Sequence, residues 1–357
     1  MANEVTLRSG FTTGACAAAA AKAAYCGKVL PVIFPDGTGK IIPVKISGNS
    51  ASVIKDAGDD PDVTDKALIS VEIEKSHQVE TEDYCETVKG GKIILCGGEG
   101  VGLATRPGLD IPPGKWAINP APRKMIVENL IDAGFNGASI RVTITVANGK
   151  EIALKTLNPT LGIVGGISIL GTSGIVVPYS NAAYIHTIDL RIRNAVAEGA
   201  KVLAFSTGSR TGKAILRDYA ELKEKNIIRI ADFIGQALES AQKAGVKKMV
   251  IACMPGKLYK YACGYKNTHA HKVKLVPELA LELLRNQSPE VLGKISKCDT
   301  VGEMSSHLGK SEFENFITEL AIMAIDQLKR IAPKLDLILM IYLSDGSLFL
   351  TQTEEKK

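Results

Sequence analysis

Residues Leu7 to Tyr25 read LRSGFTTGACAAAAAKAAY, and eight of the ten residues from Ala15 to Ala24 are alanine. Alanine forms helices readily and adds almost no side-chain bulk, so this stretch predicts a slim helix that other elements can approach closely. Thr12 and Thr13 are typical N-cap residues for it. Two interpretations follow. The helix is a tightly packed structural element, or its first-turn N–H groups and threonine hydroxyls form one wall of an anion site.

Composition restricts the class of protein. The chain has 357 residues, 45% of them hydrophobic, which is enough for two domains with sizeable cores. A net charge of +5, with scattered lysines and arginines and only 5% aromatic residues, suits an anionic small molecule better than nucleic acid. No apolar run approaches the roughly 20 residues that span a bilayer. Seven cysteines without a CxxC pair favour reduced thiols in a cytoplasmic protein. A homo-oligomer is compatible with the sequence.

The N-terminal part, residues 1–158, has the pattern of an α+β domain. Apolar segments 29–34 and 41–46 flank an Asp-Gly turn and predict a hairpin. A helix is expected over 120–133. Asn148-Gly149 lies between apolar segments 138–146 and 151–154 and predicts a second hairpin.

The C-terminal part, residues 159–357, alternates short apolar strands with helices. This alternation predicts an α/β domain with a doubly wound, mostly parallel, Rossmann-like sheet. Ligands of such sheets bind beyond the carboxyl ends of the strands. The loops at 207–212, 254–257 and 344–346 are therefore the expected binding loops.

Two glycine-rich stretches resemble nucleotide-binding motifs without satisfying them. GSRTGKA, residues 208–214, has three residues between its glycines instead of four, and Ala214 replaces the residue that would hold magnesium. GEGVG, residues 98–102, runs into TRPGLDIPPG, whose prolines prevent the helix that a dinucleotide loop needs. Neither ATP nor NAD is supported.

The loop after the strand at 202–206 still has groups that suit the amino-acid part or the ribose of a nucleoside cofactor. These residues are Thr207, Gly208, Ser209, Thr211 and Gly212. Asp232 follows the next strand, where an acid commonly accepts ribose hydroxyls. The alternative is that Asp232 only caps the following helix.

A proline-stiffened loop between residues 105 and 125 carries Arg106, Asn119, Arg123 and Lys124. Stiffness lowers the entropic cost of ordering a loop around a ligand, and arginines suit carboxylates. The alternative is a solvated surface loop. Just before this loop, Glu99 lies between two glycines and is a candidate acid or base.

Two further segments carry clustered polar residues. KDAGDDPDVTD, residues 55–65, lacks the spacing of a calcium loop, so capping aspartates are favoured over a cation site. PGKLYKYACGYKNTHAHKV, residues 255–273, places Lys257 and Lys260 near a helix start and contains His269, a candidate general base. No metal is expected, because the possible zinc ligands fit no common spacing: Cys253, Cys263, His269 and His271.

Seven stretches, in this order along the chain, resemble the CbiD family, the cobalt-precorrin-5B (C-1)-methyltransferases of anaerobic cobalamin biosynthesis. They are LRSGFTTGACAAAAAKAA, KDAGDDPDVTD, GGEGVGLATRPGL, WAINPAPRKMI, TLNPTLGIVGGISILGTSGIV, ADFIGQALESAQKAG and PGKLYKYACGYKNTHAHK. The single stretches are weakly specific, but their order and combination are quite specific. After Ser206 the family often shows Gly-Asn or Gly-Arg, and this chain departs from that pattern with TGSRTGK.

The resemblance implies an S-adenosyl-L-methionine-dependent methyltransferase that acts on carbon 1 of cobalt-precorrin-5B to give cobalt-precorrin-6A. The cobalt corrinoid is anionic, and the residues implied to bind its carboxylates are Thr12, Thr13, Arg106, Asn119, Arg123, Lys257 and Lys260. His269 is the first candidate for a base and Glu99 the second. The loop 207–212 and Asp232 would hold the cofactor. The alternatives are a corrinoid carrier without activity, or a methyltransferase for another carbon or tetrapyrrole.

Overall fold

The computed structural model describes residues 7–269, 275 and 277–353, and the chain forms two compact units, Met1–Ser180 (unit 1) and Asn181–Lys357 (unit 2). Parallel and antiparallel strands occur beside helices, so the fold is mixed α/β. The boundary expected after residue 158 lies inside unit 1, because β13 (Gly166–Ile167) pairs in parallel with β9 (Gly100–Val101). No helix within the described ranges is long and apolar enough to cross a membrane.

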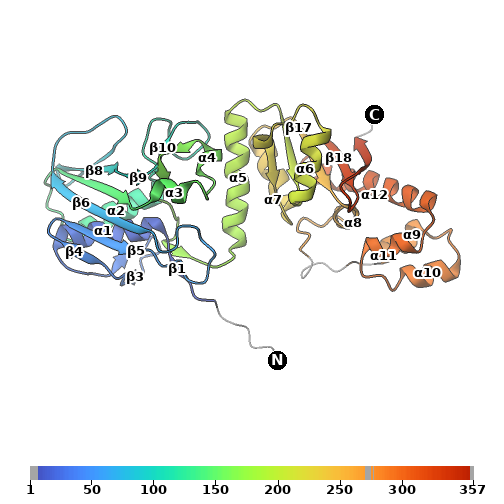
Figure 1. Ribbon diagram of the computed structural model, residues 1–357, viewed down its shortest axis with the longest axis horizontal. Coiled ribbons are helices and arrows are strands. Elements are labelled where there is room, and N and C mark those ends of the chain that lie inside the picture. The colour runs from blue at the N-terminus through green and yellow to red at the C-terminus, as the bar shows by residue number, and fades with distance from the viewer. Residues whose placement is uncertain (1–6, 270–274, 276, 354–357) are drawn as a thin grey trace. The chain divides into compact units, whose positions relative to one another are not determined.

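Unit 1 is built on a six-stranded sheet with the order β4-β5-β6-β11-β8-β7 (Figure 1). β11 lies inside the sheet, antiparallel to β6 and parallel to β8. Its residues alternate between buried and partly buried positions, as expected when successive side chains point to opposite faces. The strand bounds are β4 Lys45–Ser47, β5 Ser50–Ile54, β6 Leu68–Lys75, β7 Tyr84–Val88, β8 Gly91–Gly97 and β11 Ile140–Val146.

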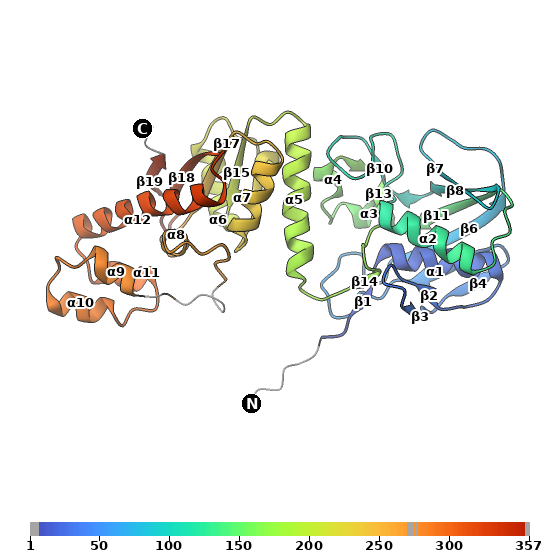
Figure 2. The same cartoon turned by 180° about the vertical axis from the view of Figure 1, so that it is seen from behind.

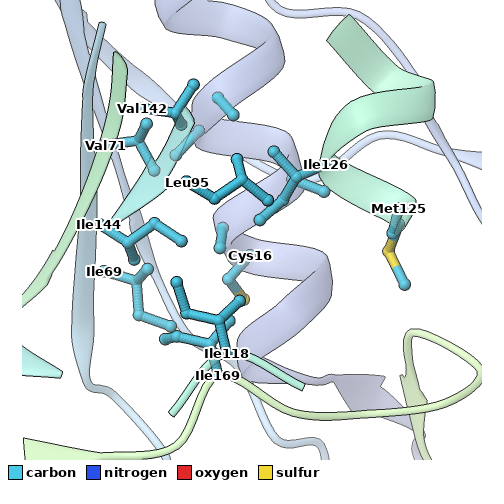
Figure 3. Packing of buried hydrophobic residues seen from close by; sticks show 14 of the residues in the cluster. Cys16, Ile69, Val71, Leu95, Ile118, Met125, Ile126, Val142, Ile144 and Ile169 are labelled. Atoms are coloured by element: carbon cyan, nitrogen blue, oxygen red, sulfur yellow. The ribbon is translucent and has the colours of Figure 1, made fainter. Parts of the chain in front are cut away.

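The alanine-rich stretch forms α1 (Thr13–Cys26), which packs against the sheet and against α2 (Pro120–Asp132). The hydroxyl of Thr12 caps it by accepting the N–H of Ala15 at 3.1 Å. All eight alanines are buried. Figure 3 shows Val71 and Leu95 of the sheet on one side of this core and Ile126 of α2 on the other. The prediction of a slim, closely approached helix is confirmed.

The first predicted hairpin is confirmed only in part. β2 (Val32–Ile33) lies in the expected first strand, but it pairs with β3 (Gly39–Lys40), which precedes the expected second strand at 41–46. Residues 45–46 of that segment belong to β4, which pairs with β5. The second predicted hairpin is wrong. After β11 the chain forms α3 (Gly149–Ala153), because β6 and β8 already occupy both edges of β11 and leave no place for a returning strand. The remaining short elements of unit 1 are β1 Gly10–Phe11, β10 Leu103–Ala104, α4 Asn158–Leu161, β12 Ile163–Val164 and β14 Ile175–Val176.

Unit 2 has a five-stranded sheet with the order β16-β15-β17-β18-β19, in which the first four strands are parallel and β19 is antiparallel. β15 lies at the strand expected over 202–206, and the four parallel strands fit the predicted alternation of strands and helices, whereas β19 was not predicted. Their bounds are β15 Val202–Ser206, β16 Ile227–Arg229, β17 Lys248–Cys253, β18 Asp336–Tyr342 and β19 Leu348–Thr353.

Helices cover both faces of this sheet (Figures 1 and 2). α6 packs on one face, over Ala204 and Val250, and α5, α7, α8 and α12 pack on the other, over Phe205 and Ile251. The short helices α9, α10 and α11 precede α12. The helix bounds are α5 Asn181–Ala197, α6 Ser209–Asp218, α7 Ile234–Lys243, α8 Pro255–Ala262, α9 Glu278–Leu283, α10 Pro289–Ile295, α11 Val301–Ser306 and α12 Lys310–Ile331.

Candidate active site

Three strands of the unit 2 sheet end together. Ser206, the last residue of β15, is in register with Arg229 of β16 and Ala252 of β17. β15 lies between the other two strands. The connection from β15 to β16 runs through α6 on one face of the sheet, and the connection from β16 to β17 runs through α7 on the opposite face. In parallel sheets a ligand crevice opens where successive connections diverge in this way. The segments that follow these strands therefore border one candidate crevice.

The first of these segments is the predicted loop at the start of α6. Thr211 braces it, because its buried hydroxyl accepts the N–H of Gly208 at 3.1 Å and donates to the carbonyl of Gly208 at 3.0 Å. Thr207 is partly exposed and Ser209 is exposed, so these two can reach a ligand. Gly212 lies against Ser206, where a Cβ atom would come within 3.3 Å of the Ser206 hydroxyl.

Two glycines of the crevice are not explained by the fold. Gly208 has φ −168°, an extended conformation that any residue adopts, and a Cβ atom there would meet nothing within 4 Å. Gly256, in the first turn of α8, likewise has nothing within 4 Å and no positive φ. Neither backbone conformation nor packing requires glycine at these positions. At both positions the described residues leave the space beside the backbone unfilled.

Asp232, which follows β16, anchors a polar cluster made of Asp232, Lys257, Lys260 and Thr268, called here the Asp232 cluster. Lys257 donates to Asp232 Oδ1 and, at 2.7 Å, to the hydroxyl of Thr268. That hydroxyl donates to Asp232 Oδ1 at 3.1 Å, and Lys260 donates to the Thr268 carbonyl at 2.9 Å. The cluster brings together three predicted binding residues from two segments of the chain.

Asp232 Oδ1 takes both side-chain bonds, whereas Oδ2 makes no hydrogen bond with the described residues. Burial disfavours the negative charge of the Asp232 carboxylate and by itself would raise its pKa. The contacts with Lys257 and Thr268 outweigh this effect and hold the pKa of the Asp232 carboxyl below its ordinary value. Partial burial, together with the nearby Lys257 charge, lowers the pKa of the Lys260 ammonium. Asp232 is therefore a carboxylate with one oxygen open to a ligand.

Ala231, next to Asp232, has φ 48°, in the left-handed region that residues with a side chain rarely adopt. Such strain costs about 1–3 kcal/mol and gathers at functional sites. Asp232 does not cap α7, which begins at Ile234 with Phe233 as its N-cap residue. The capping alternative is therefore wrong.

Sequence reasoning missed two residues of this region. Thr268 is 1% exposed and joins all three charged members of the Asp232 cluster, but no local pattern marks it. Tyr261 is buried, and its hydroxyl has no hydrogen-bond partner among the described residues. Burial raises the pKa of the Tyr261 phenol well above its ordinary value.

His269 follows Thr268 and is exposed, and its N–H donates to Asn267 Oδ1 at 3.0 Å. His269 lies next to the Asp232 cluster, because Thr268 is its neighbour in the chain. His271 lies outside the described residues. Within the described part of the chain, no group of three His, Cys, Asp or Glu side chains is arranged to hold a metal ion.

In unit 1 the threonines at the start of α1 are already used by the fold. Thr12 caps the helix. The hydroxyl of Thr13, which is 2% exposed, donates to the carbonyl of Ser168 at 3.1 Å and accepts the N–H of Leu170 at 2.8 Å. These contacts favour the structural interpretation of both residues.

The start of α2 lies beside the same segment, because Asn119 donates its N–H to the Ile169 carbonyl at 2.9 Å. A Cβ atom at Gly14 would come within 2.7 Å of Pro122, so the first turns of α1 and α2 are in close contact. The side chain of Asn119, the N-cap residue of α2, makes no capping hydrogen bond. Asn119 therefore has a polar side chain that the helix itself does not use.

The arginines of the proline-stiffened loop do not lie together. Arg123 stacks on the ring of Tyr84, 3.9 Å from its centroid, and its buried Nε has no hydrogen-bond partner among the described residues. It lines a shallow pocket of ≈ 290 Å³ with Lys124, Glu86 and hydrophobic neighbours. Arg106 is exposed and packs along Gly162. Arg123 is thus the arginine of this loop that lines the pocket beside Tyr84.

Glu99 is exposed in the tight turn between β8 and β9, and its carbonyl accepts the N–H of Val146 at 2.8 Å. The turn is short because Gly100 has φ 78° and packs against the backbone of Val146. The glycine-rich stretch at 98–102 thus forms a turn and the short strand β9, and it lacks the helix of a dinucleotide loop.

The aspartate-rich segment is structural. Each of its five carboxylates has a partner within unit 1: Asp56 and Asp59 bind Arg8, Asp60 the N–H of Tyr179, Asp62 Lys55, and Asp65 the N–H of Ala57. Lys55 is 1% exposed, so its pairing with Asp62 at 2.7 Å also satisfies a buried ammonium. The prediction of a capped turn is confirmed.

Comparison with known proteins gives a consistent result. The CbiD family model matches residues 1–178. A protein of Polaromonas naphthalenivorans named cobalt-precorrin-5B C(1)-methyltransferase is 39% identical over 95% of this chain and 95% of its own length. A protein of Geotalea daltonii with the same name is 42% identical over 75% of this chain and 77% of its own.

Among solved structures, a cobalamin biosynthesis protein (cbiD) from Archaeoglobus fulgidus is 26% identical and matches 72% of this chain and 80% of that one. Its TM-score is 0.39, which is too low for geometry to be transferred between the two.

Proposed function

The chain belongs to the CbiD family, and we propose that it catalyses the reaction that its relatives' names describe, methylation of carbon 1 of cobalt-precorrin-5B. The product would be cobalt-precorrin-6A. S-adenosyl-L-methionine, when bound, supplies a methyl group activated by a sulfonium charge. The protein's part is then to align donor and acceptor and to exclude water, which together account for much of the rate of a displacement reaction.

We assign the cofactor to the crevice of unit 2. The observation that carries this assignment is the open space at Gly208 and Gly256 beside a carboxylate with one unused oxygen. Asp232 stands after the second strand of the sheet, where an acid receives ribose hydroxyls in doubly wound folds. Its Oδ2 can accept such a hydroxyl while Oδ1 keeps its bonds. Thr207 and Ser209 supply further hydroxyls at the rim.

We assign corrinoid carboxylates to the basic residues of unit 1. Arg123 fits best, because its guanidinium is stacked on Tyr84 and the side chain lines a pocket together with Lys124. Arg106 and the side chain of Asn119 are further candidates, and Lys260 is one in unit 2. Thr12 and Thr13 would contribute through the packing of α1, since both hydroxyls are occupied.

His269 is the proposed base, and Glu99 is the second candidate. His269 follows Thr268 directly, so the hydrogen bonds of the Asp232 cluster fix its backbone. We expect His269→Ala to lower the single-turnover rate while cofactor affinity is kept, because the side chain would move a proton and not hold the cofactor. An unchanged rate would transfer the role to Glu99, and Glu99→Gln is the matching variant.

The direct test of the function is incubation of the protein with methyl-labelled S-adenosylmethionine and cobalt-precorrin-5B. The mass of the product is then measured, and the labelled carbon is mapped. Label at carbon 1 supports the proposal. Label at another carbon would mean that the chain methylates a different carbon of the corrinoid. Binding of the corrinoid without binding of the cofactor would indicate a carrier.

The crevice assignment has its own test. We expect Asp232→Asn to weaken S-adenosylhomocysteine binding by about 10- to 100-fold, because a hydrogen bond to a charged group contributes about 1.5–3 kcal/mol. Corrinoid affinity should be unchanged. Isothermal calorimetry with each ligand measures both, and equal losses would remove Asp232 from the cofactor site.

A further inference from the structure

Lys257 has hydrogen-bonding capacity that the described residues do not use. Its ammonium carries three N–H donors. Two of them are directed to Asp232 Oδ1 and to the hydroxyl of Thr268. The side chain is 25% exposed, so the third donor can reach a molecule in the crevice.

The charges of the Asp232 cluster favour an anionic group beside Lys257. The cluster contains two ammonium groups, those of Lys257 and Lys260, and one carboxylate, that of Asp232. A ligand that brings a carboxylate balances the remaining positive charge. In an adenosyl cofactor the only carboxylate is at the amino-acid end, whereas the ribose end brings hydroxyls.

The helix that carries Lys257 offers few backbone donors of its own. The N–H groups of Lys257 and Leu258 both bind the carbonyl of Met254, and Pro255 has no N–H. At this side of the crevice the lysine side chain is therefore a stronger donor than the first turn of α8. The first turn of α6, on the other side of the crevice, is the competing donor.

We propose that Lys257 binds the α-carboxylate of the cofactor while it stays bonded to Asp232, an inference that rests on the proposed function. The ammonium of Lys257 then binds the amino-acid end of the cofactor, and the Asp232 carboxylate binds the ribose. Because Lys257 and Asp232 are bonded to each other, the two binding groups keep a fixed separation. Lys257 becomes a specificity-determining residue. It selects adenosyl compounds that carry an amino-acid carboxylate over those that lack it.

The test is a ligand–protein double-mutant cycle on the full chain by isothermal calorimetry. S-adenosylmethionine is compared with its decarboxylated form, which keeps the ribose, sulfonium and ammonium. We expect the wild type to prefer the intact cofactor by about 10- to 100-fold. In Lys257→Met the preference should fall to within about 3-fold, which is less than 1 kcal/mol. Lys266→Met is the matched control, because Lys266 pairs with Glu239 at the surface.

The outcomes separate the two proposals. A preference kept in Lys257→Met assigns the carboxylate to the α6 turn and overturns this inference alone, as does a wild type that binds both ligands equally. A wild type that binds neither ligand overturns the cofactor assignment as well. If Lys257→Met does not fold, Lys257→Gln, which keeps a donor but no charge, should show the same loss of preference, and a kept preference would overturn the inference.

Discussion

Two glycines in each unit have opposite surroundings. In unit 1 a Cβ atom at Gly100 would lie 1.9 Å from the Val146 carbonyl oxygen, and one at Gly166 would lie 2.2 Å from that of Gly100. In unit 2 a Cβ atom at Gly208 or Gly256 would meet nothing within 4 Å. Gly100 and Gly166 let backbone pack on backbone, whereas Gly208 and Gly256 border open space. A glycine-rich loop is therefore evidence for a ligand only where the fold leaves the space unfilled.

The largest effect should come from Gly100→Ala. Its φ of 78° and the contact with Val146 predict a loss of about 3 kcal/mol or more in the free energy of unfolding of unit 1. Urea denaturation followed by the fluorescence of Trp116, the sole tryptophan, reports on this unit. Gly48→Ala is the matched control. Gly48 has φ 60° and nothing within 4 Å, so that variant should lose only about 1 kcal/mol. Equal losses in the two variants would contradict the packing explanation.

The next largest effect is expected for Thr13→Val. This variant tests whether the N-terminus of α1 is packed as tightly as the backbone at Gly100, with no space for a ligand. The change leaves the N–H of Leu170 without its partner, so we expect unit 1 to lose about 2 kcal/mol of stability. Corrinoid affinity should be unchanged. A fall in corrinoid affinity with stability preserved would restore the interpretation of this helix start as a binding wall.

Gly208→Thr tests the open side of the comparison. Threonine caps a helix about as well as glycine, so stability should change by less than about 0.5 kcal/mol. The added side chain would occupy the crevice and should weaken S-adenosylhomocysteine binding by about 10-fold or more, or about 1.4 kcal/mol. Unchanged binding, measured by calorimetry, would show that the space at Gly208 is not used by the cofactor.

The smallest effect is a pH dependence. The pKa of Asp232 in the folded protein lies below its ordinary value of 3.8, so its contribution to stability is present above that value and is lost as pH falls through the lowered pKa. The stability difference between wild type and Asp232→Asn should therefore be constant above about pH 5 and shrink below about pH 4. Unfolding curves across this range measure it. The difference for Thr13→Val should show no such change.

The elements that the sequence predicts well are those with strong local patterns. α1 follows from its alanines, and α2 and β17 follow from apolar periodicity and flanking prolines or glycines. The hairpin expected at 138–154 is wrong because strand pairing is decided by distant segments, here β6 and β8. The Asp232 cluster could be predicted only in part. Asp232 and Lys257 stand at strand ends, but Thr268 reaches them because the chain turns back after α8, which no local pattern encodes.

The burial of α1 has a consequence for how relatives are recognised. The sheet and α2 surround the alanines of α1, so most larger side chains there would overpack the core. The available volume therefore restricts which residues this segment can contain. The family model matches residues 1–178, which lie within unit 1, whereas the crevice with Asp232 and Lys257 lies in unit 2. A gene copy that had lost both crevice residues would still carry the alanine helix and still be counted as a member. Under the proposed cofactor site, positions 208, 232, 256, 257 and 268 would be the ones to compare between active and decayed copies.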